Sequence, residues 1–513
     1  MSFHIRRVSD EKPHGGSLLW KRLGRVALCF GHPLLQWYVH WMKRHEEEEK
    51  KKRLRTLLQR TLMVLLALLC SAFLLAGLMQ ALGSLKLLSL KTVTAVAGGV
   101  LHATPEGQTN ILLLGQGDEE QGKDLTDSIL VISLDPKETQ SAALISIPRD
   151  LYFVKTETLG SGRLNSLYRD RKYQLQFRTG LEEEEASTQA LKELKEEIGR
   201  MIGEDVHYVA KVHFQAFVDM VDALDGIDID VPEDLSDPEF PGPNYTFEPF
   251  EITKGPHHLD GITALKYARS RSTTSDFDRS KRQQQILMAL VRTAMASKLH
   301  RNPGKLLAIL RDLSPSVATD LTSREMLGLV LAISDVDIDH VITTQLSDRN
   351  GLYGEPLYSG GFLYNPPRDL FEGASVLLPI SIPEYPVTWK QIQAFTTLLF
   401  HHRELFLKSP SLSILNAGAP GGSALKLGNE LQRFGLEVER IANAKIEKQD
   451  ASSLILRDEG TTPLAEDLGS ILQMPLSPLL PSFLDPALME DLTLVLGKNF
   501  TFRPLQSLLH PPL

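Results

Sequence analysis

An uncharged stretch of 25 residues, from Thr61 to Leu85, most constrains how this chain of 513 residues folds. As a helix it is about 37 Å long at about 1.5 Å per residue, which exceeds the roughly 30 Å hydrocarbon core of a bilayer. The alternatives are a buried core helix and a cleaved secretory signal. A core helix seldom runs this far without a polar face, and the apolar part of a signal is shorter, at about 7–15 residues. We therefore expect residues 61–85 to form one transmembrane helix.

The charges on the two sides of this segment predict its orientation. Residues 1–60 carry 14 Lys and Arg against 6 Asp and Glu, whereas the rest of the chain carries 41 basic and 58 acidic residues. Basic residues that flank a membrane helix stay on the cytoplasmic side. We therefore expect a basic cytoplasmic tail at 1–60 and a single pass through the cell membrane, with residues 86–513 outside. Because the tail shows no helix-turn-helix pattern and the body is acidic, no nucleic acid is expected as a partner.

After a linker at 86–104, short apolar segments give way to helical patterns. Nearly continuous apolar runs begin at Asn110, Ser128 and Ala142, and such runs are typical of strands covered on both faces. Helical spacing predicts helices over 187–201, 214–224, 259–269 and 276–297. The mixed order of elements predicts an α/β domain over 105–300, an α-β-α sandwich with a mixed central sheet between helical layers.

Two further regions follow residue 300. Residues 301–405 are rich in proline, with a helix near Ser323–Ser334, and we interpret them as an accessory or linker region rather than a second catalytic core. A strand–helix–strand pattern begins at Ser411, and another strand begins at Asp491. This pattern predicts a small α/β domain over 411–505.

Arginines dominate the part of the sequence that is suited to chemistry. Arg149 follows the third apolar strand behind a proline, which places it at a sheet edge, where ligand sites often form. Arg269 and Arg271 lie where a helix gives way to a loop, and Arg279 and Gln283 share one face of the next helix. A guanidinium presents five donors in a fixed fork, which suits phosphate oxygens. We expect a phosphate cradle; the alternative for each arginine is an ordinary solvated charge.

Aspartates lie close to the same strand ends. Asp127 opens the second strand, and Asp118 and Asp124 lie in the segment before it. A carboxylate beside phosphate-binding arginines is unfavourable unless a divalent cation lies between them, and Mg²⁺ held by one or two carboxylates and substrate phosphate is the usual arrangement. The alternative is an aspartate that only caps a turn at the start of the strand. No Walker-type loop, HExxH or paired CxxC motif occurs in the sequence.

The segments around these residues resemble the LytR-CpsA-Psr family of bacterial cell-wall proteins. The resemblance covers about 105–300 through these segments, in order: Asn110–Gly115, Leu125–Ser128, Ser146–Asp150, Arg163–Tyr168, Val221–Ile227, Leu259–Arg271 and Asp276–Gln283. Residues 414–438 and 491–500 resemble the LytR C-terminal domain that is often attached to this family. The family's layout is a short cytoplasmic tail, one span and an external catalytic domain, which agrees with the charge argument above.

This resemblance implies an Mg²⁺-dependent phosphotransferase, with residues 105–300 as its catalytic domain. Such proteins move a glycopolymer from a polyprenyl pyrophosphate carrier to a peptidoglycan hydroxyl outside the cytoplasm. The implied partners are therefore the polyprenyl pyrophosphate-linked glycan, peptidoglycan and membrane lipid. Two alternatives stay open, a non-catalytic scaffold that binds lipid or wall, and a polyprenyl-pyrophosphate hydrolase that uses water as the acceptor.

The resemblance also implies roles for single residues. Pyrophosphate binding falls to Arg149, Arg163, Arg269, Arg271, Arg279 and Gln283. Catalytic roles fall to Asp127, Arg149, Arg269 and Arg271. Asp276 is implied to orient the neighbouring arginines, and Asp127 to ligate the metal.

Two positions depart from the family pattern. Leu125 stands where many members have an arginine, which removes one cation from the cradle. Gly117 stands where many members have an aspartate, and Asp118 follows one step later, so we expect Asp118 as the second metal ligand. These two changes are the reason why the scaffold interpretation stays open.

Overall fold

The computed structural model describes residues 101–117, 124–242, 246–270, 276–296, 316–322, 340–352, 356–380, 388–444, 448–477 and 489–510, with a few single positions between 325 and 337. The expected tail, transmembrane helix and most of the linker lie outside these ranges, as do Asp118 and Arg271. Within the described ranges, no helix has both the length and the apolar character that crossing a membrane requires.

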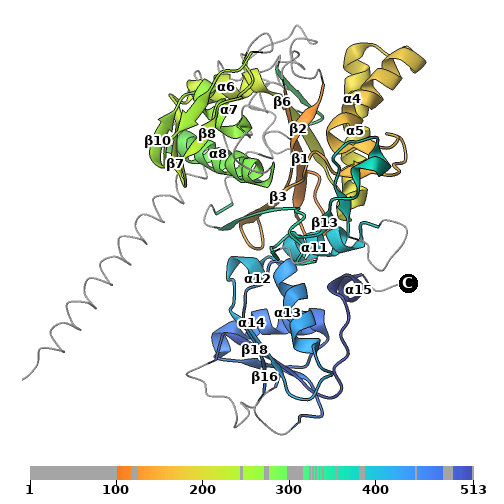
Figure 1. Cartoon of the computed structure of the whole chain (residues 1–513), viewed down its shortest axis with the longest axis vertical. Coiled ribbons are helices and arrows are strands. Elements are labelled where there is room, and N and C mark those ends of the chain that lie inside the picture. The colour runs from red at the N-terminus through yellow and green to blue at the C-terminus, as the bar shows by residue number, and fades with distance from the viewer. Residues whose placement is uncertain are drawn as a thin grey trace, which may run out of the picture. The chain divides into compact units, whose positions relative to one another are not determined.

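A six-stranded mixed sheet organises the residues before 346 (Figure 1). Its strands are, in spatial order, β11 (Val317–Thr319), β6 (Tyr208–His213), β1 (Thr109–Gln116), β2 (Thr126–Asp135), β3 (Ser141–Ser146) and β12 (Val341–Gln345). β2 is antiparallel to both β1 and β3, whereas β6 runs parallel to β1 and β12 runs parallel to β3. The mixed α/β fold and the mixed sheet are therefore confirmed.

Helices cover both faces of this sheet because alternate residues of a strand point to opposite sides. On β1, Leu112 and Leu114 enter one buried core, whereas Ile111 and Leu113 pack into the other. The first core is covered by α4 (Leu164–Gln174) and α5 (Glu183–Ile202), and the second by α6 (Phe214–Ala223), α7 (Gly261–Arg269) and α8 (Asp276–Ala296). Figure 1 shows these two helix groups on opposite sides of the sheet.

The region that the sequence marks as accessory supplies both edges of the sheet. β11 and β12 come from residues after 300, so the domain boundary expected at residue 300 falls inside the sheet. β12 pairs with β3 over Ala142–Ser146. This pairing joins distant parts of the chain and leaves no local signal in a proline-rich stretch. Further along, α11 (Lys390–His401) packs into the first core beside α5.

Short two-stranded ribbons complete this part of the chain. They pair β7 (Ile227–Val231) with β10 (Gly255–Leu259), β8 (Leu235–Asp237) with β9 (Phe250–Ile252), β4 (Tyr152–Phe153) with β5 (Gly162–Arg163), and β13 (Leu363–Tyr364) with β14 (Leu378–Pro379). The burial of β7 alternates between buried and exposed residues, as expected for a two-stranded ribbon with one solvated face.

A second, four-stranded sheet forms after residue 411. Its order is β16 (Val438–Asn443), β15 (Leu412–Asn416), β18 (Leu492–Leu496) and β17 (Ser453–Leu456). The helices α13 (Ser423–Arg433) and α14 (Thr462–Leu472) pack against it. The expected strand–helix–strand order is thus present, and its assignment as a LytR C-terminal domain stays a prediction.

Candidate active site

The strands of the central sheet place the expected site residues at one edge. β1, β3, β6 and β12 all run in the same direction and end at this edge, whereas the antiparallel β2 begins there. Asp127 therefore lies beside the end of β3, and Arg149 follows that end by three residues. Ligands of α/β proteins commonly bind outside the carboxyl ends of the strands.

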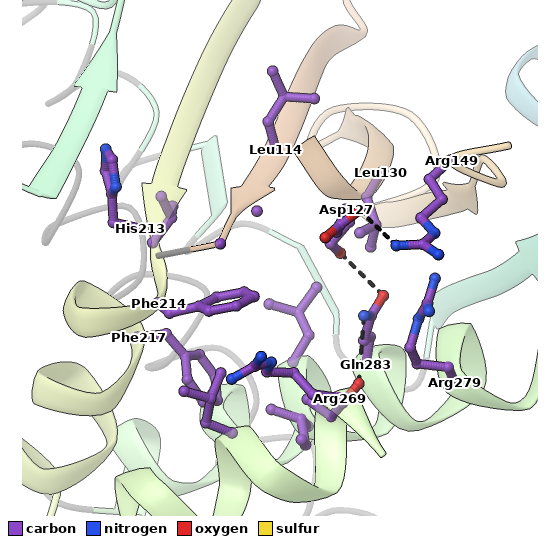
Figure 2. A pocket seen from close by; sticks show the side chains of 18 of the residues that line it. Leu114, Asp127, Leu130, Arg149, His213, Phe214, Phe217, Arg269, Arg279 and Gln283 are labelled. Carbon is purple, nitrogen blue, oxygen red and sulfur yellow. Dashed lines mark hydrogen bonds and ion pairs between the residues drawn. The ribbon is translucent and has the colours of Figure 1, made fainter. Parts of the chain in front are cut away.

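A cavity of about 450 Å³ lies at this edge between the sheet and the helices α6, α7 and α8 (Figure 2). Much of its lining is apolar and includes Leu113, Leu130, Phe217, Ile286 and Leu290. Its lining also brings together Asp127, Arg149, Arg269, Arg279 and Gln283, which come from four separate segments of the sequence. The cavity thus joins an apolar space to guanidinium groups, an arrangement suited to a ligand with an anionic head and an apolar tail.

Asp127 and Arg149 form an ion pair across the strand ends. The Nη1 atom of Arg149 donates to Oδ1 of Asp127 at 2.7 Å, and the two side chains are 17% and 32% exposed. Before Arg149, the amide of Ile147 still donates to the carbonyl of Ile129 at 2.9 Å, so sheet pairing continues up to Pro148. The arginine is therefore held by the sheet and remains within reach of a ligand.

Gly115 lets β1 and β2 approach closely at the cavity. A Cβ atom at this position would lie 2.9 Å from the Cβ of Ser128, which is nearer than side chains tolerate. The Ser128 hydroxyl in turn donates to Oε1 of Gln283 at 3.0 Å. The small residue on β1 thus permits the contact that links β2 to α8.

Arg279 and Gln283 lie one turn apart on α8 and both line the cavity, as their spacing predicts. Arg279 is only 5% exposed and Arg282 is 7% exposed, whereas the Lys281 side chain between them is 66% exposed. The alternative of a solvated surface charge is therefore wrong for Arg279, and Arg282 is buried as well, whereas Lys281 is a solvated charge.

Two aromatic rings hold Arg269 at the end of α7. Its guanidinium carbon lies 4.7 Å from the ring centre of Phe214 and 5.4 Å from that of Phe240. Guanidinium groups bind aromatic faces at such distances. Figure 2 shows Phe214 and Arg269 side by side in the cavity. The sequence identified Phe214 only as part of a helical stripe, so its contact with the arginine was missed.

Arg282 fixes the helix end that carries Arg269. Its Nε donates to the carbonyl of Tyr267 at 3.1 Å, and its Nη2 donates to the carbonyl of Ser270. The last carbonyls of a helix lack partners within the helix, so a buried cation satisfies them well. Burial lowers the pKa of Arg282, against the favourable effect of Tyr267 and nearby carboxylates. Nothing in the local sequence pattern distinguishes this arginine from Lys281.

The other residues that the sequence predicts for the site do not line the described part of the cavity. Asp118 and Arg271 lie outside the described residues, and Asp276 begins α8 without a described side chain. Arg163 does not line the cavity: its Nη1 lies 3.4 Å from Oδ1 of Asp150, and its side chain is 44% exposed. Asp150 connects it to the cavity, since Oδ2 of Asp150 lies 3.7 Å from Nε of Arg149.

The described residues offer a limited donor set for a metal ion. Among them, no group of three or more His, Cys, Asp or Glu side chains gathers as a metal site would require. Asp127 brings one carboxylate to the cavity, whereas Asp124 is buried and accepts a hydrogen bond from Lys172 at 2.9 Å. Because Mg²⁺ often takes only one or two carboxylates together with substrate phosphate, Asp127 fits an ion that the substrate helps to hold.

A closed polar network lies on the opposite face of the sheet. Nζ of Lys172 lies 2.9 Å from Oδ2 of Asp124 and 2.8 Å from Oε1 of Glu183. Burial opposes the charge of Lys172, but the hydrogen bonds to Glu183 and Asp124 outweigh it and raise the lysine pKa. Nζ of Lys211 donates to the hydroxyl of Tyr168 at 2.8 Å, and burial lowers the pKa of Lys211 to about 8. This network ties the segment before β2 to α4 and α5.

Comparison with known proteins supports the resemblance found in the sequence. The LytR_cpsA_psr family matches residues 88–361. The chain is 28% identical over 222 residues to the polyisoprenyl-teichoic acid–peptidoglycan teichoic acid transferase TagU of Bacillus mycoides, covering 43% of this chain and 62% of TagU. It is 31% identical over 227 residues to the cell wall biosynthesis protein LcpA of Corynebacterium glutamicum, covering 42% of this chain and 41% of LcpA.

Among solved structures, B. subtilis TagV is 22% identical, with a TM-score of 0.40, over 58% of this chain and 99% of that chain. In the two sequence comparisons, the aligned region spans about three fifths of TagU and a smaller share of LcpA. The family match covers more than half of the present sequence. The chain therefore belongs to the LytR_cpsA_psr family.

Proposed function

We propose that this protein transfers a cell-wall glycopolymer from a polyprenyl pyrophosphate carrier to a hydroxyl group of peptidoglycan. The observation that carries the proposal is the cavity in which an apolar lining meets Arg149, Arg269 and Arg279. A lipid diphosphate has the anionic head and apolar tail that such a cavity suits. Family membership, and similarity to a protein named as a teichoic acid transferase to peptidoglycan, support the same class of reaction.

In the proposed reaction, the arginines bind and orient the diphosphate. The acceptor oxygen forms a bond to the phosphorus that carries the glycan, and the bond from this phosphorus to the bridging oxygen breaks. Polyprenyl phosphate leaves with the electron pair, and the hydroxyl proton ends on this leaving phosphate. Catalysis of such a transfer rests mainly on positioning and on stabilising charge. Arg269 is positioned for this by Phe214, and Arg149 by the sheet.

We propose Mg²⁺ as the cofactor because of the charge balance of the lining. Besides its three arginines, the cavity is lined by the carboxylates of Asp127, Asp237 and Glu239. A diphosphate adds negative charge that this set does not balance. Asp127 would hold the ion, with Asp118 as the second proposed ligand, and the ion would supply positive charge to the phosphate oxygens when bound.

We also propose that residues 61–85 anchor the protein in the cell membrane, with residues 1–60 in the cytoplasm and the described residues outside. The length of the uncharged stretch and the excess of basic residues before it support this topology. Reaction of an impermeant thiol reagent with single cysteines tests it. We expect a cysteine in place of exposed Lys281 to react in intact cells and Cys29 to stay protected; the opposite pattern contradicts the proposal.

The activity is tested with the full chain in detergent, a lipid-linked pyrophosphoryl glycan, Mg²⁺ and soluble peptidoglycan fragments. We expect mass spectrometry to show the joined glycan–peptidoglycan phosphodiester and released polyprenyl phosphate, and we expect EDTA to abolish both. Release of polyprenyl phosphate without a joined product, in the presence of acceptor, identifies a hydrolase instead. Lipid binding without release identifies a scaffold.

A further inference from the structure

A second cavity, of about 120 Å³, adjoins the first. Both cavities are lined by Asp127, Ser128, Arg149, Arg279 and Gln283, so the two arginines lie between them. The further lining of the smaller cavity is mixed and carries more polar side chains than the first cavity does. Its hydroxyl, amide and carboxylate side chains come from Ser146, Asp150, Ser280, Asp348, Asn365 and Ser375.

The described residues between 346 and 377 reach this cavity because both ends of this segment are bonded to the turn that carries Arg149. The amide of Leu346 donates to the carbonyl of Ser146 at 3.0 Å, directly after β12 ends. At the other end of the segment, the amide of Leu377 donates to the carbonyl of Asp150 at 2.9 Å, and Leu377 accepts from the amide of Tyr152 at 2.8 Å. The turn is thus held from both sides by the segment that contributes half of the polar lining.

Asp348 and Asn365 form the outer part of this lining. The Asn365 amide donates to Oδ2 of Asp348 at 2.6 Å, and the Asn365 side chain is exposed. A carboxylate beside an amide offers acceptors and donors at once, which is what neighbouring sugar hydroxyls require. Phe277, partly buried at the start of α8, adds an apolar surface against which a sugar ring can pack.

We propose that this second cavity binds the acceptor glycan and presents its hydroxyl to the phosphorus held by Arg149 and Arg279. The inference rests on the function proposed above. The volume corresponds to a few water molecules, so the cavity admits the reacting edge of one sugar and leaves the rest of the glycan outside. At about 120 Å³ it lacks the volume for a lipid tail.

The arrangement of the two cavities favours the acceptor over the donor's own glycan. In phosphoryl transfer the attacking and leaving oxygens lie roughly in line, on opposite sides of the phosphorus. With the lipid tail in the apolar cavity, the leaving phosphate lies on that side of the shared arginines. The attacking hydroxyl therefore comes from the polar side, where Asp348, Asn365 and Ser375 lie.

The test uses two cavity variants, Asn365→Ala and Ser375→Ala, in the full chain. Both positions are exposed, so the fold is expected to persist. The matched control is Asp369→Asn, an exposed residue of the same segment that does not line the cavity. We measure KM for a soluble peptidoglycan acceptor at saturating donor, and KM for the lipid-linked donor at saturating acceptor.

We expect each cavity variant to raise the acceptor KM at least tenfold while the donor KM changes less than twofold, and Asp369→Asn to change neither. Partial recovery in Asn365→Gln, which keeps the amide, supports hydrogen bonding to the glycan. An unchanged acceptor KM, or a raised donor KM instead, overturns the inference while transfer by the unmodified chain upholds the proposed function. Absence of transfer by the unmodified chain overturns both.

Discussion

The two faces of the central sheet both bury positive charge, but they use it differently. On the side of α4 and α5, Lys172 lies within 3 Å of two carboxylates, the buried one of Asp124 and the exposed one of Glu183. On the side of α6, α7 and α8, Arg149 and Arg279 border a cavity of about 450 Å³. A buried cation alone therefore does not mark a ligand site. The cation and an adjoining cavity together do.

The closed network is expected to matter most for stability. Lys172→Met leaves the buried carboxylate of Asp124 without its counter-charge, and breaking such a pair costs about 3–5 kcal/mol. We expect a marked fall in the urea midpoint of unfolding, and recovery of most of it in the double variant with Asp124→Asn. A midpoint unchanged by Lys172→Met would show that the network is not structural.

The face of the sheet that carries the cavity is expected to matter most for activity. Arg279→Ala removes a buried donor from both cavities, and the loss of one such group commonly slows catalysis about 10²–10³-fold. Initial rates of glycopolymer transfer measure the effect. Lys281→Ala, two positions away and exposed, is the control and should keep its rate. Transfer within threefold of the unmodified chain in Arg279→Ala would remove this cavity from the proposed mechanism.

The contact between Gly115 of β1 and Ser128 of β2 lies at the cavity. Gly115→Ala places a Cβ atom 2.9 Å from that of Ser128, and such overpacking costs about 1–3 kcal/mol. We expect lower stability, and slower transfer because Ser128 also bonds Gln283. Gly421→Ala, where the structure shows open space, serves as the control. Equal urea midpoints for the two variants would contradict the close approach.

Substitution of Lys211 is expected to have the smallest effect on stability. That effect should depend on pH. Burial lowers its pKa from 10.5 to about 8, so between pH 8 and 10.5 the unfolded chain binds more protons than the folded one. Stability therefore rises with pH over this window, and the full penalty applies below pH 8. Lys211→Met should raise stability by about 1–2 kcal/mol at pH 7, since one pKa unit is worth about 1.4 kcal/mol.

Urea midpoints at pH 7 and pH 9 measure this effect. The gain from Lys211→Met should shrink at pH 9, where the unmodified lysine is already mostly neutral in the folded state. Tyr168 keeps a hydrogen-bond partner in the variant, because its hydroxyl lies 2.8 Å from that of Ser187. A variant that is less stable at pH 7, or a gain that does not depend on pH, would show that Lys211 is charged without penalty.

The sequence predicted best those elements whose pattern is local. The apolar run from Ala142 became β3, and the helical spacing after Asp276 became α8, each within a residue or two. Residues 130 positions apart share no periodicity, so the meeting of Arg149 with Arg279 was expected from the suitability of guanidinium groups for phosphate and from the family resemblance.

Long-range contacts explain what the sequence did not predict. β12 has a half-buried, threonine-containing sequence among prolines, and only its pairing with β3 makes it an edge of the sheet. Arg282 was indistinguishable from exposed Lys281 until the carbonyls of α7 were placed beside it. Asn365 carried no signal at all, since its relevance depends on the bonds between residues 346–377 and the turn at Arg149.

The parallel pairing of β12 with β3 also bears on the order in which the strands of the central sheet can pair. The paired residues are about 200 positions apart, so a growing chain can form the ribbon of β1, β2 and β3 long before its outer edge arrives. Closing so long a loop is entropically costly, and folds with such contacts form slowly. The turn at Arg149 gains its last backbone partner only when Leu377 has been synthesised. We therefore expect the backbone around Arg149 to be fully held only after residue 377 has been synthesised.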